Sequence, residues 1–424
     1  MENNFLLIYD VENRTLTHKG AAIDRFEHRT CSGERLIFER TPDGLRWEVP
    51  FFLVDNIFHF QEDRKVYFGR HLDQFRGFTE FDAGANVLLR QHGFLPHART
   101  QLKDVGIVCS YLTYTLGADG ITVTPCFPYR CSTEKYSVDD LMEVFRDAFR
   151  KQLERVNRDT WLLPLSGGMD SRMLLSLALE HKDIDLQLFT VGTHRSGDVK
   201  VAQSISRNLG LAEKHKILYL EDVTRSDLLH NYQACDYLLP LDRILTKPLD
   251  NFFKKSVVLS GLYGDVIFAD NPPDITCYST YYESEGFKQY NYFDNQIVQA
   301  YEGLPALPKL QRMALRCQKL TRQSFPISSE FDFVTPFVDP QVIVVASNIK
   351  APRLYQDLVS RHMRPELRKF IHQSTMSYFT HPNWLRVAER KFFKLLRHPA
   401  RVPYFDSAYL QSIGVFSNEA PFLE

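Results

Sequence analysis

Long hydrophobic runs are absent from this sequence of 424 residues. Apolar stretches such as 342–346 and 257–259 are far shorter than the about 20 residues that a helix needs to span a bilayer. The N-terminus also lacks the basic residues of a signal peptide, and Asp10 and Glu12 interrupt its apolar run. We therefore expect a cytoplasmic protein without a membrane partner.

An excess of charge of one sign is also missing. Lys and Arg total 51 and Asp and Glu total 52, so the formal net charge is -1. Such a chain has no global electrostatic field that attracts nucleic acid or anionic lipid, and nucleic acid is not an expected partner. The seven cysteines are scattered and odd in number, unlike the even set of a small extracellular disulfide framework. We expect ordinary reduced thiols.

The apolar pattern that is present divides the chain into two parts. Up to about residue 130, short strand-like segments alternate with turn signals such as Pro42-Asp43-Gly44. We expect strands at 5–8, 36–38, 45–49, 66–68, 107–116 and 121–123, and a helix within 79–92. This pattern predicts a β-rich α+β domain.

The spacing of apolar residues becomes helical after Ser137, which forms a capping-box pattern with Asp140. Strands at 161–165, 186–191, 217–220 and 257–259 then alternate with helices, one of which ends at Gly210. This alternation is typical of an α/β domain with a doubly wound parallel sheet. Beyond about residue 300 the pattern is mostly helical, so we expect a helical C-terminal part.

The motif that carries chemistry lies where the strand at 161–165 ends and a helix begins. It reads Leu165-Ser166-Gly167-Gly168-Met169-Asp170-Ser171. Its glycines let the backbone approach a ligand, so that N–H groups at the helix N-terminus can face phosphate oxygens. The two serines add hydroxyl donors, and Asp170 offers a hard oxygen ligand for the Mg²⁺ that accompanies a polyphosphate. The Walker-type loop is absent.

This motif resembles the pyrophosphate loop of the ATP-pyrophosphatase superfamily, specifically the synthetase domain of asparagine synthetase-like proteins. Three later segments resemble the same family: 189–210, 257–265 and the Pro336-Phe-Val-Asp339 segment. The resemblance implies an adenine nucleotide α-hydrolase-like sheet that binds ATP and Mg²⁺. It implies that Asp170 and Asp265 are metal ligands, and that the nucleotide contacts Leu165, Ser166, Gly167, Gly168, Asp170, Ser171, Val191, Ser260 and Gly261.

The first 130 residues also resemble the family's N-terminal glutaminase domain, most clearly at 88–100. In glutamine-using members that domain exposes an N-terminal cysteine as the nucleophile. Here residue 2 is Glu2 and the first cysteine is Cys31, which has no α-amino group of its own to act as a base. We therefore predict a degenerate N-terminal-nucleophile glutaminase domain at residues 1–133, followed by the ATP-pyrophosphatase domain at residues 134–424.

The sequence departs from the family at two places in the predicted site. Leu262 stands where asparagine-forming members carry a Glu, and Tyr263 follows it as either a replacement acid/base or a packing residue. Arg172 follows the loop, where a guanidinium can bind a phosphate or a substrate carboxylate; the alternative is a surface arginine.

A basic stripe recurs late in the chain, at Arg390, Lys394, Arg397 and Arg401 with Lys391 adjacent. The family places a lysine from this region over the leaving pyrophosphate, so the resemblance implies Lys391 or Lys394 as a catalytic residue. The alternative is a solvated helix face.

The resemblance implies an ATP-dependent ligase that adenylates a substrate carboxylate and lets an amine, from a source other than glutamine, displace AMP. Natural-product macrolactam, lactam or tailoring amide formation is the nearest analogy, with a protein partner from the same pathway. Two alternatives stay open: a related enzyme acting on a nucleobase or RNA, and a non-catalytic nucleotide-binding scaffold.

Overall fold

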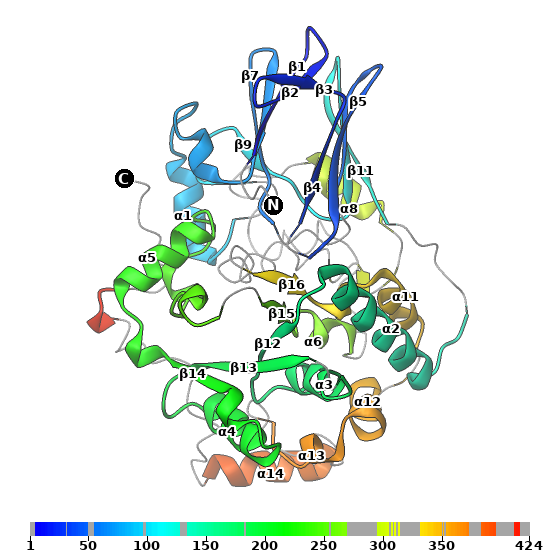
Figure 1. Ribbon diagram of the computed structural model, residues 1–424, viewed down its shortest axis with the longest axis vertical. Helices are drawn as coiled ribbons and strands as arrows, with labels where there is room; N and C mark the ends of the chain where they lie inside the picture. The colour runs from blue at the N-terminus through cyan, green and yellow to red at the C-terminus, as the bar shows by residue number, and fades with distance from the viewer. Residues whose placement is uncertain are drawn as a thin grey trace.

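The structure is a computed structural model that describes residues 5–30, 32–49, 55–95, 99–127, 134–181, 184–253, 256–268, 295–304, 307, 309–310, 313, 331–349, 351, 353–372, 383–395 and 411–415. Figure 1 shows a β-rich part at the top, built from residues 5–127, and an α/β part below it. This order confirms the predicted succession of a β-rich region and an α/β region.

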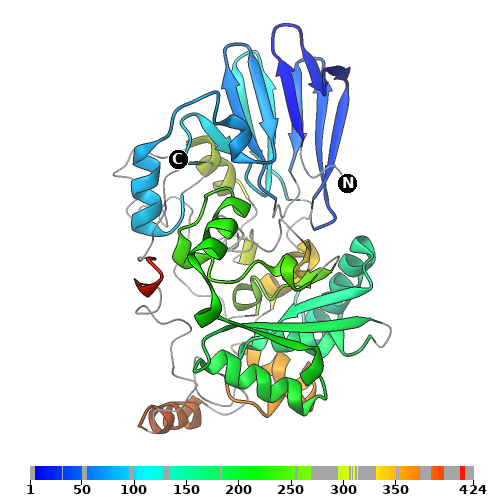
Figure 2. The ribbon, with the colours of Figure 1, turned by 60° about the vertical axis from the view of Figure 1, so that its left-hand side comes forward.

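The β-rich part consists of two antiparallel sheets that face each other (Figure 2). One sheet has the order β3-β2-β1-β8-β7-β9, and the other has the order β11-β10-β6-β5-β4. The strands are β1 (Leu6–Asp10), β2 (Thr15–His18), β3 (Ala21–Ile23), β4 (Arg25–Arg29), β5 (Arg35–Thr41), β6 (Gly44–Glu48), β7 (Phe58–Glu62), β8 (Lys65–Gly69), β9 (Val105–Ile107), β10 (Leu112–Gly117) and β11 (Gly120–Pro125). Beside them lie η1 (Leu72–Phe75) and α1 (Ala83–His92).

Aromatic side chains fill the space between these two sheets. Phe68 on β8 lies with its ring centroid 5.0 Å from those of Phe38 and Trp47 on the opposite sheet. All three residues are 0% exposed. Alternate residues of a strand point to the same face, so one face of each sheet supplies this core.

The α/β part is built on a five-stranded sheet with the order β14-β13-β12-β15-β16. The strands are β12 (Thr160–Pro164), β13 (Asp185–Gly192), β14 (His215–Tyr219), β15 (Val257–Leu259) and β16 (Asp332–Val334), and every neighbouring pair is parallel. The chain runs outward from β12 to β14, then crosses to the other side of β12. This reversal confirms the predicted doubly wound sheet.

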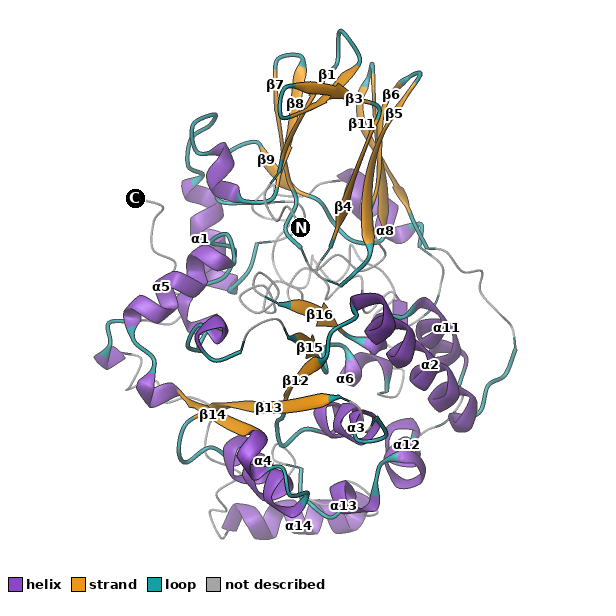
Figure 3. Ribbon diagram, viewed as in Figure 1, coloured by secondary structure: helices purple, strands orange, loops and turns teal. Residues whose placement is uncertain are grey.

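Helices surround the parallel sheet, and Figure 3 shows α3 and α4 on the side away from the N-terminal strands. They are α2 (Val138–Val156), α3 (Met169–Ala178), α4 (Gly197–Asn208), α5 (Arg225–Ala234), α6 (Gly264–Ile267), α8 (Asn295–Glu302), α11 (Pro340–Asn348), α12 (Leu354–His362), α13 (Pro365–Arg368) and α14 (Asn383–Leu395). Short 3₁₀ turns are η2 (Ala212–Lys214), η3 (Leu220–Asp222), η4 (Leu241–Arg243), η5 (Leu249–Asn251) and η7 (Pro336–Val338). Within the described ranges, no helix has the length and apolarity to cross a membrane.

Two local expectations need correction. The strand expected over 107–116 is two strands, β9 and β10, which belong to different sheets and are separated by a turn at Tyr111 with φ +67°. The mostly helical region beyond residue 300 also contains β16, which pairs with β15. A three-residue strand is too short to show a period of two, so the pattern could not reveal it.

The predicted helix ends are confirmed. Ser137 Oγ accepts a hydrogen bond from Asp140 N at 3.1 Å, and Asp140 Oδ2 accepts from Ser137 N at 2.7 Å. These bonds close the capping box that starts α2. Gly210 follows α4 with φ +69°, the left-handed conformation that commonly ends a helix.

Buried polar contacts join the two parts of the molecule. Asp236, which is 4% exposed, accepts a hydrogen bond from Asn56 Nδ2 at 2.6 Å and one from Leu72 N at 3.1 Å. Elsewhere, Tyr301 on α8 donates its hydroxyl to the carbonyl oxygen of Ser110 at 3.0 Å. The N-terminal sheets are therefore fixed to the α/β part by contacts that exclude water.

Candidate functional site

Two loops lie next to each other at the carboxyl edge of the parallel sheet. One is 165–168, between β12 and α3, and the other is 260–263, between β15 and α6. Because β12 and β15 are adjacent and parallel, both loops leave the sheet at the same edge. The chain reverses its direction of travel between these strands, and such crevices bind ligands in open α/β sheets. The strand–turn–helix setting expected for the motif is confirmed.

The 165–168 loop is held by bonds among its own residues. Ser166 Oγ accepts from Gly168 N at 3.0 Å and lies 3.1 Å from Ser171 Oγ, which in turn accepts from Ser166 N at 3.2 Å. Gly167 N donates to Asp198 Oδ1 at 2.8 Å. Asp198 lies in the first turn of α4, so its carboxylate already occupies one of the loop's N–H donors.

Two carboxylates meet beside this loop. Asp170 lies in the first turn of α3, and Asp265 lies in the first turn of α6. Burial raises the pKa of Asp170 to about 7; a hydrogen bond from Tyr355 opposes the shift, and the negative charge of Asp265 adds to it. The two acids therefore lie close enough to repel each other.

A magnesium ion fits this pair of carboxylates. Mg²⁺ in proteins is usually bound by one or two carboxylates together with substrate phosphates. Its charge would oppose the burial and the repulsion by Asp265 that raise the pKa of Asp170. Within the described residues, no group of three or more His, Cys, Asp or Glu side chains is arranged to hold a metal ion by itself.

Gly264 leaves room for the Asp170 carboxylate. A Cβ at Gly264 would lie 2.4 Å from both Cγ and Oδ1 of Asp170. Gly264→Ala should therefore displace the carboxylate and lower ATP-dependent turnover about 100-fold, the cost of an ångström-scale misplacement. Steady-state kinetics would measure the loss, with Gly77→Ala as the control because its added Cβ meets nothing within 4 Å. Equal turnover in both variants would contradict the assignment.

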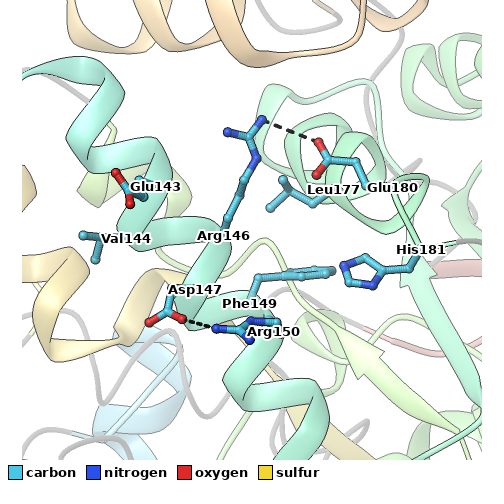
Figure 4. A pocket seen from close by; sticks show the side chains of 9 residues that line it. All are labelled: Glu143, Val144, Arg146, Asp147, Phe149, Arg150, Leu177, Glu180 and His181. Atoms are coloured by element: carbon cyan, nitrogen blue, oxygen red, sulfur yellow. Dashed lines mark hydrogen bonds and ion pairs between the residues drawn. The ribbon is translucent and has the colours of Figure 1, made fainter.

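A cavity of about 460 Å³ lies elsewhere, between α2 and the C-terminal end of α3 (Figure 4). Ion pairs line it, with Arg146 and Glu180 3.5 Å apart and Arg150 and Asp147 2.7 Å apart. The 165–168 loop is at the opposite end of α3, a helix of ten residues and thus about 15 Å long. This cavity is therefore separate from the site of the two carboxylates.

Comparison with known families identifies the segment that contains both loops. Residues 140–322 match the family described as asparagine synthase. This part of the chain is therefore similar to an asparagine synthase domain. The match supports an ATP-using, ligase-like or nucleotide-modifying enzyme. The predicted boundary between residues 133 and 134 is not tested by the match and stays a prediction.

Solved structures similar to the chain are remote. The U34-tRNA thiolase NcsA from Methanococcus maripaludis, with its 4Fe–4S cluster, is 12% identical with a TM-score of 0.27, covering 66% of this chain and 78% of that one. NAD+ synthetase from Burkholderia pseudomallei is 15% identical with a TM-score of 0.21, covering 64% of this chain and 93% of that one. No curated protein gives a significant match.

Arg172, in the matched segment, is buried, so its interpretation as a surface arginine is wrong. It is 0% exposed, and burial lowers its pKa to about 10. Its guanidinium donates to the carbonyl oxygens of Gly167 at 2.8 Å, Phe370 at 2.8 Å and Ile371 at 2.6 Å. Arg172 therefore connects the segment after α13 to the 165–168 loop. Contact with a phosphate or a substrate stays a prediction.

The second loop is tied to the sheet and to Asp170. Ser260 N donates to the carbonyl oxygen of Val334 at 2.8 Å, and Ser260 Oγ accepts from Leu262 N at 3.2 Å. A Cβ on Gly261 would lie 3.1 Å from Cβ of Asp170. Val191 lies half-buried near the end of β13, the strand next to β12. Nucleotide contacts by these residues stay predictions.

Tyr263 lies inside the domain. It is 1% exposed, and its φ of +69° precedes the first residue of α6. This burial agrees with the packing interpretation of the residue. Its alternative role as an acid/base, in place of the Glu that Leu262 replaces, stays a prediction.

The two predicted lysines lie on α14, which Figures 1 and 2 place at the edge of the molecule. Lys391 is exposed, which agrees with a solvated face. The side chain of Lys394 lies outside the described residues, as do Arg397, Arg401, Glu2 and Cys31. The catalytic role of either lysine and the absence of a glutaminase nucleophile stay predictions.

Sequence reasoning missed Tyr355, on α12. Its hydroxyl donates a hydrogen bond to Asp170 Oδ1, although the two residues are 185 positions apart. The predicted Pro336–Asp339 segment is linked to this contact through aromatic rings. The ring centroid of Phe268 lies 5.0 Å from that of Phe337 in η7 and 5.5 Å from that of Tyr355. This segment therefore reaches the site through Phe268.

A buried series of hydrogen bonds also supports the 165–168 loop. Thr190 on β13 donates its hydroxyl to the carbonyl oxygen of Leu165 and lies 2.8 Å from Nε2 of His215. Nδ1 of His215 lies 2.8 Å from Oγ of Ser206 on α4. A neutral imidazole with the proton on Nε2 donates to Thr190 and accepts at Nδ1 from the hydroxyl of Ser206, which also lies 3.2 Å from the carbonyl oxygen of Gln203. Burial lowers the pKa of His215 to about 4, which keeps the ring neutral.

His215 should make the protein sensitive to acid. Because its pKa falls from 6.5 to about 4 on folding, the unfolded chain binds a proton in this interval that the folded chain does not. The stability from neutral His215 is thus complete above pH 6.5 and is lost as the pH falls toward 4. Urea midpoints measured across this interval should fall less steeply for His215→Gln than for the wild type. Parallel pH profiles would contradict this account.

Proposed function

We propose that the chain is an ATP-dependent ligase of the AMP-forming type that joins a substrate carboxylate to an amine. The observation that carries the proposal is the close approach of Gly261 and Gly264 to Asp170, which places Asp265, the residue after Gly264, near Asp170 beside the 165–168 loop. The asparagine synthase match over residues 140–322 supports the use of ATP by this site.

In the first step a carboxylate oxygen of the substrate attacks the α-phosphorus of ATP. The bond between the α-phosphorus and the oxygen bridging to the β-phosphate breaks, which gives an acyl-adenylate and pyrophosphate. The N-terminus of α3 directs its positive dipole end toward the phosphates. Asp170 and Asp265 would hold Mg²⁺, which supplies charge neutralisation at the phosphates when bound. The chain contributes mainly position and charge.

In the second step the amine nitrogen attacks the acyl carbon, the bond to the AMP oxygen breaks, and the nitrogen releases a proton. We propose that this amine is ammonia or a group on a substrate rather than nitrogen from glutamine. The reason is that Cys31 has no α-amino group to activate it. Macrolactam, lactam or tailoring amide formation in natural-product biosynthesis fits this scheme, as does a protein partner from the same pathway.

Product analysis tests this proposal. The purified chain with ATP, Mg²⁺ and a panel of carboxylates and amines should form AMP and pyrophosphate in equal amounts. Glutamine should give no glutamate, and Cys31→Ala should leave product formation unchanged. ADP and phosphate as products would overturn the AMP-forming type. Binding of ATP without either pair of products, across the whole panel, would favour the non-catalytic scaffold.

A further inference from the structure

Tyr355 is held rigidly beside the two carboxylates. Its ring packs edge-on against Phe268 at a centroid distance of 5.5 Å and an angle of 64°. Phe268 in turn lies 5.1 Å from Phe145 on α2 and 5.0 Å from Phe337 in η7. This aromatic cluster joins α12 to α2 and η7, so the Tyr355 hydroxyl has little freedom to move.

The hydroxyl acts as a hydrogen-bond donor to the carboxylate. A phenol ionises only near about pH 10, so the Tyr355 hydroxyl carries its hydrogen at neutral pH and donates a hydrogen bond to Asp170 Oδ1. A donor fixed on one oxygen restricts rotation of the carboxylate and leaves the remaining lone pairs for a metal ion.

Asp170 is also constrained on its other sides. Gly264 and Gly261 of the second loop approach it so closely that an added Cβ would lie 2.4 Å from Cγ and 3.1 Å from Cβ of Asp170, respectively. These contacts limit where the side chain can go, but neither glycine offers a side-chain donor. Among the bonds that involve the Asp170 carboxylate, the one from Tyr355 fixes its rotation.

We propose that Tyr355 is a positioning residue for the metal site, orienting Asp170 as a ligand by its hydrogen bond to Oδ1. The inference rests on the proposed function, because it takes Asp170 to be a Mg²⁺ ligand. It extends that function by assigning to α12, outside the matched segment 140–322, a part in building the metal site. Donors that orient metal ligands typically contribute 10–100-fold in metal affinity.

Binding of Mn²⁺ in the presence of ATP, followed by the electron paramagnetic resonance signal of the free ion, tests this proposal without turnover. Tyr355→Phe should bind Mn²⁺ about 10–100-fold more weakly than the wild type. Tyr232→Phe is the matched control, since its buried hydroxyl bonds Gln101 at 3.3 Å, away from the carboxylates. That control should bind Mn²⁺ as the wild type does.

Replacement of Tyr355 by 4-aminophenylalanine keeps a donor at the same place and should restore Mn²⁺ affinity. This rescue separates orientation from packing, and it decides the question even if Tyr355→Phe folds poorly. Mn²⁺ affinity within twofold of the wild type in Tyr355→Phe would overturn the proposal. If that result is obtained, Asp170→Asn shows which assignment is wrong. Normal Mn²⁺ binding by Asp170→Asn would mean that Asp170 is not a metal ligand. Weakened binding by Asp170→Asn would mean that only the role of Tyr355 is wrong.

Discussion

Asp170→Asn should abolish ATP-dependent turnover, with a loss of at least about 1000-fold, while the fold stays intact. The substitution removes a negative charge from the place where Mg²⁺ and the phosphates meet, and charge stabilisation at such sites is usually the largest single catalytic contribution. Asp265→Asn should give a similar loss, because both carboxylates are proposed to hold the same ion. Pyrophosphate release and circular dichroism would measure activity and fold. Substantial pyrophosphate release from folded Asp170→Asn would contradict the assignment.

The same variant should be more stable than the wild type when metal is absent. The pKa of Asp170 rises from 3.8 to about 7 on folding, so the folded state is penalised for carrying its charge at higher pH. The stability associated with the protonated acid is complete below pH 4 and is lost as the pH rises through 7. At pH 8, Asp170→Asn should gain on the order of 2–4 kcal/mol in unfolding free energy. Urea unfolding in chelator would measure it.

Arg172→Met should cost about 3–5 kcal/mol of unfolding free energy, the usual result of removing one partner from a buried charged network. Methionine keeps much of the volume but leaves the carbonyl oxygens of Gly167, Phe370 and Ile371 without their donor. The same substitution removes the hydrogen bond that Arg172 donates to the 165–168 loop, so the KM for ATP should rise. Urea unfolding and ATP titration would measure the two effects.

Two further variants separate positioning by Arg172 from direct contact with substrate. Arg172→Lys keeps the charge but lacks the planar fork, so it should fall between the wild type and Arg172→Met in stability. Arg150→Met removes an exposed arginine and should change little. Unchanged stability with lost turnover in Arg172→Lys would mean that Arg172 acts on the substrate rather than on the loop.

Much of the candidate site could be predicted because its determinants are local in sequence. The motif at 165–171 combines a strand end, two glycines and a helix start within seven residues, and the capping box of Ser137 and Asp140 spans four. Each depends on backbone geometry that neighbouring residues decide. The parallel pairing of β12, β13 and β14 agrees with the predicted alternation of strand and helix.

What could not be predicted depends on contacts between distant residues. Tyr355 reaches Asp170 across 185 positions, and nothing around Tyr355 indicates an acid beside it. The alternative of a surface arginine failed for Arg172 because a charged residue is usually exposed, whereas here the carbonyl oxygens of 367–371 compensate its burial. β16 is recognisable only from its pairing with β15. Tertiary structure overrides local preference at all three.

The contacts of Asp236 show what the N-terminal part supplies to the α/β part. Asn56 and the backbone of Leu72 supply the hydrogen bonds that this buried carboxylate needs. Loss of either donor while the contact stays closed would leave this buried carboxylate short of a hydrogen bond, at a cost of at least about 1–3 kcal/mol. The N-terminal sheets therefore contribute to the folding of the α/β part through these donors, whatever chemistry the sheets themselves carry.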